Sequence, residues 1–142
     1  MAAILLIDDD SLVRASLKLQ LELGGHVVTD ADDGGKGLRA FEGGRFDAVI
    51  TDIIMPGVEG VETVRRLRQS DPSVVIIAMT GGTPIPAPSR SGTAPDYLRM
   101  VSRLGATATI RKPFTGTALL ALIDQSLATN RSAPDAMAAP FL

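Results

Sequence analysis

Several short apolar runs in this sequence end at side chains that could take part in phosphoryl chemistry. Each run has the length of a buried strand, and a polar or charged residue stands at or next to its end. The candidates are Asp8, Asp9 and Asp10 after residues 4–7, Asp52 after residues 48–50, Thr80 after residues 74–79, and Lys112 after residues 107–110. The carboxyl ends of parallel strands lie at one edge of a sheet, so we expect these residues to converge there.

Carboxylates gathered this closely repel one another, and they stay ionised together only when a cation lies among them. Hard carboxylate oxygens with no His or Cys nearby favour Mg²⁺, which takes one or two protein carboxylates and keeps several waters. The hydroxyl of Thr80 can donate to a phosphoryl oxygen, and the ammonium of Lys112 supplies a point charge. With Asp52 as the nucleophile, this set is sufficient for in-line phosphoryl transfer that yields an aspartyl phosphate.

The elements that must position these residues alternate between strand-like and helix-like patterns. Strands are expected near residues 4–7, 27–29, 48–52 and 74–79, with helices near residues 12–23, 34–42 and 59–69 between them. Such alternation is typical of βαβ units. We therefore expect an α/β fold, with a doubly wound parallel sheet and helices on both of its faces.

The second half of the chain is less regular. Residues 81–95 hold four prolines and three glycines, a composition that predicts an irregular loop. A short amphipathic helix is expected over residues 97–104, a fifth strand over residues 107–110, and a last helix from Thr115 to residue 127. From Thr129 to Leu142 the chain is rich in Ala and Pro without an apolar period. We expect one domain over residues 1–128, followed by a flexible tail or the start of a linker over residues 129–142.

Composition limits the classes of function. The chain has 142 residues, 45% of them apolar and 21% charged, which is ordinary for a globular protein. The absence of cysteine removes disulfides, thiolate metal sites and cysteine catalysis. A net charge of −2 offers no electrostatic footprint for nucleic acid, and no apolar run is long enough to cross a bilayer. We expect a cytoplasmic domain that binds neither nucleic acid nor membrane.

Four motifs, in the same order along the chain, carry a resemblance to a known family. They are Leu5-Leu6-Ile7-Asp8-Asp9-Asp10, Thr51-Asp52-Ile53-Ile54-Met55-Pro56-Gly57-Val58-Glu59-Gly60, Ala78-Met79-Thr80-Gly81 and Arg111-Lys112-Pro113-Phe114. Together they resemble the receiver domain of two-component response regulators, over about residues 3–127. The resemblance implies a flavodoxin-like five-stranded sheet.

The resemblance also implies roles for individual residues. Asp52 would be phosphorylated by a histidine kinase or a histidine phosphotransfer protein, and a downstream protein of unspecified kind would read the result. Asp8, Asp9, Asp52 and the backbone carbonyl of Ile54 would hold Mg²⁺. Thr80 and Lys112 would report the phosphoryl group.

Two features depart from the family pattern. Receivers usually carry Tyr or Phe three residues before the lysine, and this chain has Thr109 there. A small β-branched side chain cannot make the large rotamer change of an aromatic ring. The segment between Thr80 and Lys112, which includes the Pro-rich residues 81–95, is also longer than the family needs. We therefore expect phosphate sensing to be intact and its usual route of transmission to be altered.

Two alternative functions remain open at this point. A Mg²⁺-dependent phosphohydrolase of the haloacid dehalogenase type would use Asp8 as its nucleophile and Asp10 as its acid/base. Against it, the acidic pair expected after the lysine is absent, since residues 113–127 contain a single acidic residue, Asp124. A receiver-like interaction module that no longer depends on phosphorylation is the second alternative, motivated by Thr109.

Other polar residues have simpler interpretations. Ser11 can cap the first helix, and Asp10 is read as a cap or hydrogen-bond partner rather than as a metal ligand. His26, the only histidine, is expected to be structural, at the start of a surface strand. The arginines of the third helix, Arg65, Arg66 and Arg68, are expected to form its solvated face.

Overall fold

The protein folds around a five-stranded parallel sheet with the strand order β2-β1-β3-β4-β5. The computed structural model describes residues 1–53, 59–80 and 102–138, and the side chains of residues 59 and 131–138 are outside that description. The strands are β1 (Ala3–Ile7), β2 (Val27–Ala31), β3 (Ala48–Asp52), β4 (Val75–Thr80) and β5 (Ala108–Arg111). The predicted flavodoxin-like arrangement is confirmed, and the observed strand bounds lie close to the expected ones.

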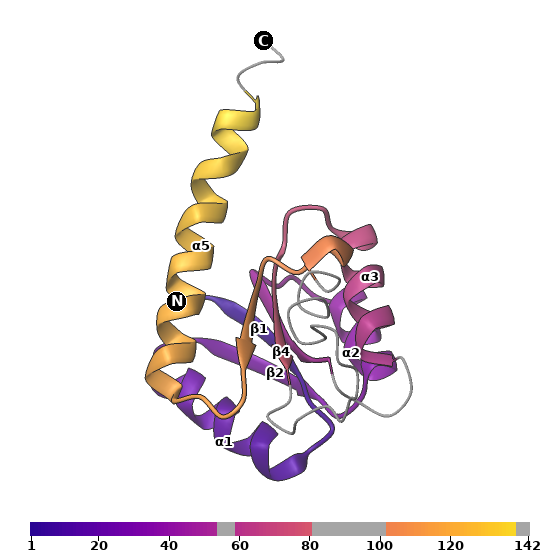
Figure 1. The fold of residues 1–142 in the computed structure, drawn as a ribbon, viewed down its shortest axis with the longest axis vertical. Coiled ribbons are helices and arrows are strands. Elements are labelled where there is room, and N and C mark those ends of the chain that lie inside the picture. The colour runs from indigo at the N-terminus through magenta and orange to yellow at the C-terminus, as the bar shows by residue number, and fades with distance from the viewer. Residues whose placement is uncertain (54–58, 81–101, 139–142) are drawn as a thin grey trace, which may run out of the picture.

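Helices cover both faces of this sheet (Figure 1). Helices α1 (Ser11–Leu23) and α5 (Gly116–Ala138) pack on one face, while α2 (Gly34–Glu42) and α3 (Glu59–Ser70) pack on the other. The run of β1 shows why a continuous apolar sequence is needed here. Ile4 and Leu6 join the core beneath α1 and α5, and Leu5 and Ile7 join the core beneath α2 and α3.

Helix caps keep the connections after the strands short. Asp10 is the N-cap of α1, and its side chain accepts hydrogen bonds from the backbone N–H groups of Leu12 and Val13. Ser11, which we expected to be able to cap this helix, is instead its first residue. Asp33 caps α2 in the same way by accepting from Lys36 N. The chain therefore turns into α1 directly after Asp8 and Asp9, which keeps both residues at the edge of the sheet.

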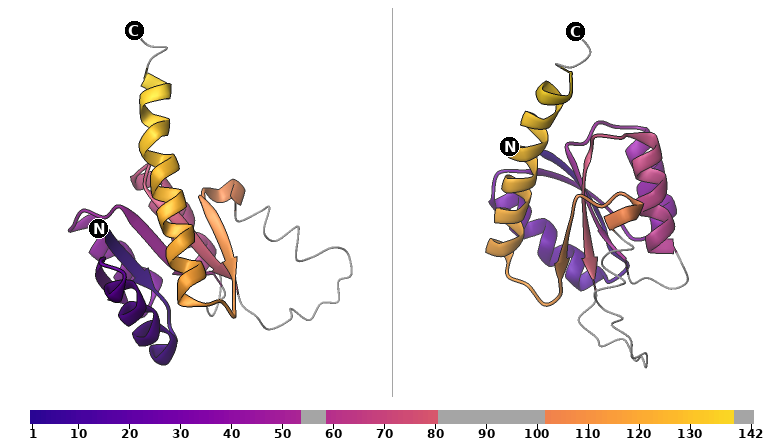
Figure 2. Two further views of the ribbon diagram at one scale, coloured as in Figure 1. Left: turned by 90° about the vertical axis from the view of Figure 1, so that its left-hand side faces the viewer. Right: turned by 45° about the horizontal axis from the view of Figure 1, so that its top comes forward.

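The last helix is longer than the one expected to end at residue 127. Helix α5 continues to Ala138, and the boundary at residue 128 between domain and tail stays a prediction. In Figures 1 and 2 this helix runs past the end of the sheet. The apolar period does stop after Leu127, so an apolar face does not account for the last turns of this helix. The Pro-rich residues 81–95 and most of the helix expected over residues 97–104 lie outside the described residues.

Arg68 of α3 holds the turn that leads into β5, so its predicted role as a solvated residue is wrong. Its guanidinium donates to the carbonyl oxygen of Gly105 from Nε at 3.0 Å and from Nη2 at 2.8 Å. Gly105 has a φ of +125°, a conformation that favours glycine. Thr107 N then donates to Ile76 O at 2.7 Å, which begins the pairing of β5 with β4. This contact sets the position of β5 and of Lys112 at its end.

Candidate functional site

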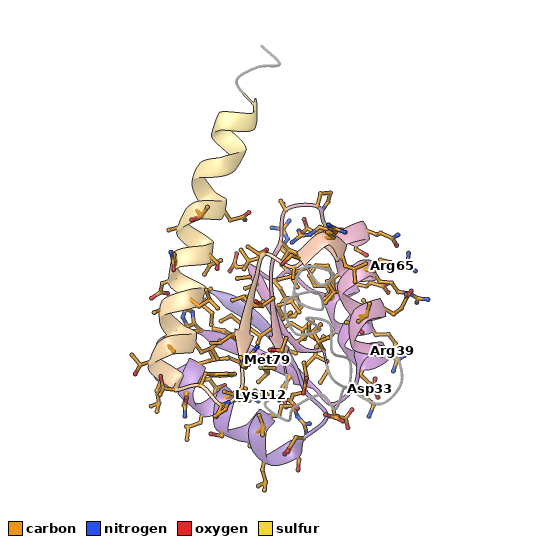
Figure 3. The ribbon with its side chains drawn as sticks, in the orientation of Figure 1. Asp33, Arg39, Arg65, Met79 and Lys112 are labelled. Atoms are coloured by element: carbon orange, nitrogen blue, oxygen red, sulfur yellow. The ribbon has the colours of Figure 1, made fainter. Side chains whose placement is uncertain are left out.

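The predicted site residues meet at one edge of the sheet because all five strands run in the same direction. Ile7 pairs with Thr51, so Asp8 and Asp52 stand at the ends of adjacent strands. Asp52 pairs with Met79, and Thr80 with Arg111, which brings Thr80 and Lys112 to the same edge. Figure 3 shows Lys112 at this edge, whereas Arg39 and Arg65 lie on the helices α2 and α3.

Lys112 joins two of the carboxylates directly. Its Nζ lies 2.9 Å from Asp52 Oδ2 and 3.1 Å from Asp8 Oδ2. Both carboxylates are buried, with 0% exposure at Asp8 and 4% at Asp52. Burial by itself lowers the pKa of Lys112, but the carboxylates of Asp52 and Asp8 outweigh it and raise that pKa above its ordinary value. Lys112 is therefore a cation at neutral pH, and it partly neutralises the acidic residues.

The carboxylates of Asp8, Asp9 and Asp52 form a compact cluster. One oxygen from each lies within 4.8 Å of the others, and Asp9 is the exposed member. Three anionic oxygens and one ammonium leave the cluster with negative charge, which fits a hard divalent cation. The residues present therefore suit Mg²⁺. Ile54, whose carbonyl was expected to be a further ligand, lies outside the described residues.

Thr80 and Asp10 have distinct places beside this cluster. Thr80 is 6% exposed at the end of β4, and its hydroxyl donates to the carbonyl oxygen of Ile110 across a long 3.4 Å contact. Such a weak bond is readily exchanged for one to an anionic oxygen. The carboxylate of Asp10 caps α1, as expected, through Oδ1, which accepts from Leu12 N and Val13 N.

Sequence reasoning missed the role of Arg14. Its Nη1 donates to the backbone carbonyl of Asp8 at 2.7 Å, and its Nε donates to Asp30 Oδ2 at 2.9 Å. Its position one helical turn after Asp10 was the available signal, but a basic residue there is equally typical of a solvated helix face. The partner, Asp30, is supplied by β2, which no local pattern could indicate.

His26 is structural, as predicted, although its side chain is buried rather than on the surface. The imidazole Nδ1 accepts a hydrogen bond from Ala2 N at 3.1 Å and so joins the start of β1 to the residue before β2. Its residue exposure is 8%. His26 also lies far along the strands from the acidic cluster, because Ala2 and Asp8 flank opposite ends of β1.

Comparisons with known proteins agree with this geometry. The family model described as the response regulator receiver domain matches residues 4–124. Transcriptional regulatory protein FixJ of Bradyrhizobium diazoefficiens is 32% identical over 124 residues, covering 87% of this chain and 56% of FixJ. An uncharacterized transcriptional regulatory protein of Bacillus subtilis, YkoG, is 34% identical over 127 residues, covering 89% of this chain and 51% of YkoG. The chain thus spans about half the length of these curated relatives.

Solved structures show the same fold. A receiver domain protein from Clostridium thermocellum superposes with a TM-score of 0.80 at 29% identity, covering 94% of this chain and 99% of that one. A CheY-like receiver domain protein from Methanospirillum hungatei also superposes with a TM-score of 0.80, at 28% identity. The superposition covers 94% of this chain and 98% of the Methanospirillum chain. Within the described residues, no helix combines the length and the apolarity that a membrane span requires.

The matches decide between the two families that the sequence left open, the receiver domains and the haloacid dehalogenases. They give no support to a haloacid dehalogenase, and the residue expected to be its acid/base caps a helix. The matched residues 4–124 include the strand ends that carry Asp8, Asp52, Thr80 and Lys112. By its sequence and its fold, this chain belongs to the response regulator receiver domain family, a family of signalling domains.

Proposed function

We propose that Asp52 is the phosphoacceptor of this receiver domain. The observation that carries the proposal is the bridge of Lys112 Nζ between Asp52 Oδ2 and Asp8 Oδ2, at 2.9 and 3.1 Å. These residues come from the ends of β3, β1 and β5, so the bridge exists only in the folded sheet. It holds the Asp52 carboxylate at the edge where open α/β sheets bind their ligands.

In the proposed reaction, one carboxylate oxygen of Asp52 attacks the phosphorus atom of the donor. A new P–O bond forms, and the bond from phosphorus to the donor's leaving group breaks with its electron pair going to that group. Lys112, which is protonated at neutral pH, supplies positive charge to a phosphoryl oxygen. The hydroxyl of Thr80 exchanges its 3.4 Å contact with Ile110 O for a second phosphoryl oxygen. Both residues thus bind the transferred group and are not consumed.

The carboxylates of Asp8, Asp9 and Asp52 would hold Mg²⁺, and the carbonyl of Ile54 is proposed as a further ligand. When bound, Mg²⁺ supplies charge neutralisation and orientation to the phosphoryl oxygens. The compact carboxylate cluster, with oxygens within 4.8 Å of one another, supports this choice of residues. Hard oxygen donors without imidazole or thiolate favour Mg²⁺ over softer metals.

The proposed donor is a histidine kinase or a histidine phosphotransfer protein, as is general for receivers of response regulators. The proposed setting is the cytoplasm, and the proposed domain covers residues 1–128. A downstream protein or effector domain would receive the signal. FixJ and YkoG are named as transcriptional regulatory proteins, and this chain spans about half of each. We propose no nucleic-acid contact through the receiver domain itself.

The transmission of the signal is proposed to differ from that of an aromatic switch. Thr109 lies in β5, is partly buried and pairs in register with Ala78 of β4. It occupies the position at which receivers usually carry Tyr or Phe, and it lacks a ring that could swing inward. Because this ring is missing, the test below also includes a result that would support a module working without phosphorylation.

The test is incubation with acetyl phosphate and Mg²⁺, followed by measurement of intact mass. We expect the native protein to gain one phosphoryl group, and we expect both EDTA and Asp52→Asn to abolish the gain. Lys36→Met is a matched control, because its ion pair with Asp32 is on the surface. No adduct with the native protein would instead support a phosphorylation-independent module. An adduct that persists in Asp52→Asn and disappears in Asp8→Asn would contradict the assignment of the nucleophile.

A further inference from the structure

The turn between β1 and α1 is held by a set of hydrogen bonds that meet around Asp9. Asp8 N donates to Ala31 O at 3.2 Å, and Asp10 N donates to Asp8 Oδ1 at 2.9 Å. Arg14 N donates to Asp10 O at 2.9 Å. The backbone on either side of Asp9 is therefore fixed by neighbouring groups.

The side chain of Asp9 has no such support. It is exposed, and within the described residues no hydrogen bond or ion pair reaches its carboxylate. Its place in the cluster with Asp8 and Asp52 thus depends on the direction of its own backbone. The peptide unit that joins Asp8 to Asp9 sets that direction, and the carbonyl of this unit accepts from Arg14 Nη1 at 2.7 Å.

Arg14 is in turn held by Asp30. Its Nε donates to Asp30 Oδ2 at 2.9 Å, and Lys18 Nζ donates to Asp30 Oδ1 at 3.3 Å. The Arg14 side chain is only 18% exposed and that of Asp30 is 30% exposed. A planar guanidinium with two fixed acceptors has little freedom to rotate. Burial alone raises the pKa of Asp30, but Arg14 and Lys18 outweigh it and lower that pKa, so Asp30 is ionised at neutral pH.

The ion pair between Arg14 and Asp30 also separates Arg14 from the ion pairs of the acidic cluster. Within the described part of the chain, the ion pair of Arg14 is with Asp30, and the ion pairs of Asp8 and Asp52 are with Lys112. Without the Asp30 carboxylate, the guanidinium of Arg14 would lose one of its two fixed acceptors. Its hydrogen bond to the Asp8 carbonyl would then be less constrained.

We propose that Arg14 and Asp30 together are positioning residues for the divalent-cation site, with Arg14 orienting Asp9 through the Asp8 carbonyl and Asp30 holding the guanidinium of Arg14 in place. This inference rests on the proposed function of the acidic cluster. It assigns the cation affinity of the domain partly to two residues that do not touch the cation. Partners that orient metal ligands typically affect metal affinity by about 10–100-fold.

The experiment measures the Kd for Mg²⁺ by isothermal titration calorimetry at fixed ionic strength, without any phosphoryl donor. We expect Arg14→Met to raise the Kd on the order of tenfold. Asp30→Asn should raise it as well, because the guanidinium of Arg14 then loses its ionised partner. Arg65→Met is the matched control, since this exposed arginine pairs with Glu62 on α3, and it should leave the Kd unchanged.

The double variant Arg14→Met/Asp30→Asn separates positioning from a general loss of stability. If Asp30 acts through Arg14, the double variant binds Mg²⁺ no more weakly than Arg14→Met alone. Circular dichroism identifies any variant that fails to fold, and Asp30→Asn, which lies outside the acidic cluster, then carries the test. A native protein that binds Mg²⁺, with Arg14→Met and Asp30→Asn unchanged in Kd, overturns this inference alone. A native protein that binds no Mg²⁺ overturns both the inference and the proposed cation site.

Discussion

Lys112 neutralises two carboxylates that the fold has removed from water. With Asp8 0% exposed and Asp52 4% exposed, loss of the ammonium leaves two buried like charges beside one another. Breaking a buried pair costs several kcal/mol, and the cost is reduced here because 22% of the lysine side chain is exposed.

We expect Lys112→Met to lower the free energy of unfolding by roughly 2–3 kcal/mol in EDTA. Urea denaturation measures this change, and Mg²⁺ should restore a large part of the loss because a cation again lies among the carboxylates. Lys36→Met, which removes an exposed lysine, should change the free energy by less than about 0.5 kcal/mol. An equal effect of Mg²⁺ on Lys112→Met and on the native protein would contradict the electrostatic role.

Gly60 touches the backbone immediately after Asp52. A Cβ atom at this position would overlap the carbonyl group of Ile53. Because backbone cannot swing aside as a side chain can, the start of α3 or the end of β3 would have to move.

We expect Gly60→Ala to lower the free energy of unfolding by about 1–3 kcal/mol and to slow phosphorylation of Asp52. Gly35→Ala is the control, since a Cβ on Gly35 in α2 meets only ordinary contacts, from 3.4 Å outward. That substitution should instead be neutral or stabilising by up to about 1 kcal/mol. Thermal denaturation and intact mass together check both effects, and a Gly60→Ala protein as stable as Gly35→Ala would refute the close contact.

The residue types and the strand ends were sufficient to predict which side chains meet. Asp8, Asp9, Asp52, Thr80 and Lys112 converge as expected because each follows a buried strand of one parallel sheet. Sequence could not show that Lys112 bridges Asp8 and Asp52, since that depends on the reach of the side chain from β5 past the end of β4. The same limit applies to Arg14, whose partners come from β1 and β2.

At the scale of elements, Arg68 ties α3 to the turn before β5. It donates to Gly105 O from two nitrogens and to Asp71 O from Nη1 at 3.1 Å. Its guanidinium is partly buried, and burial lowers its pKa despite the nearby Asp71. Removal of the guanidinium would leave the carbonyl of Gly105 without this donor.

We expect Arg68→Met to lower the free energy of unfolding by about 1–3 kcal/mol and to speed hydrogen exchange in β5. The control is Arg66→Met on the same helix, where the arginine side chain is 60% exposed and pairs with Glu62. This change should cost less than about 1 kcal/mol. Hydrogen exchange followed by mass spectrometry compares the two, and equal protection of residues 108–111 in both variants would contradict the tie.

Element order was predictable because alternating apolar runs and caps are local signals. The parallel strand order follows from the short right-handed connections that such units require. The extent of α5 was not predictable from its apolar period, which stops at Leu127 while the helix continues to Ala138. The arginines of α3 carried no signal that distinguishes Arg68, which binds Gly105, from Arg65 and Arg66, which pair with Glu62.

At the scale of the whole molecule, surface pairing on α3 contributes a pH-dependent part of the stability. Hydrogen bonds from Arg65 and Arg66 lower the pKa of Glu62 from its ordinary 4.5 to about 2. A carboxylate with a depressed pKa in the folded state favours folding at every pH above its unfolded pKa. This contribution disappears as the pH falls through the folded pKa.

We therefore expect Glu62→Gln to be less stable than the native protein at pH 7. The difference should decline as the pH falls from about 4.5 to 2, where the native carboxylate becomes protonated. Urea denaturation at a series of pH values measures this. High salt should reduce the difference at pH 7, because the pair is exposed. A difference that is constant down to pH 2 would show that the effect of Glu62→Gln is not electrostatic.

The decisive measurement is the position of the phosphoryl group in the chain. After treatment with acetyl phosphate and Mg²⁺, borohydride reduces an aspartyl phosphate to homoserine, which marks the acceptor permanently. Trypsin places Asp52 in residues 46–65 and Asp8 in residues 1–14, so the candidate nucleophiles fall in different peptides. We expect homoserine at position 52, identified by tandem mass spectrometry and absent from Asp52→Asn. Homoserine at position 8, or at no position in a protein that binds Mg²⁺, would contradict the assignment of Asp52 as the phosphoacceptor.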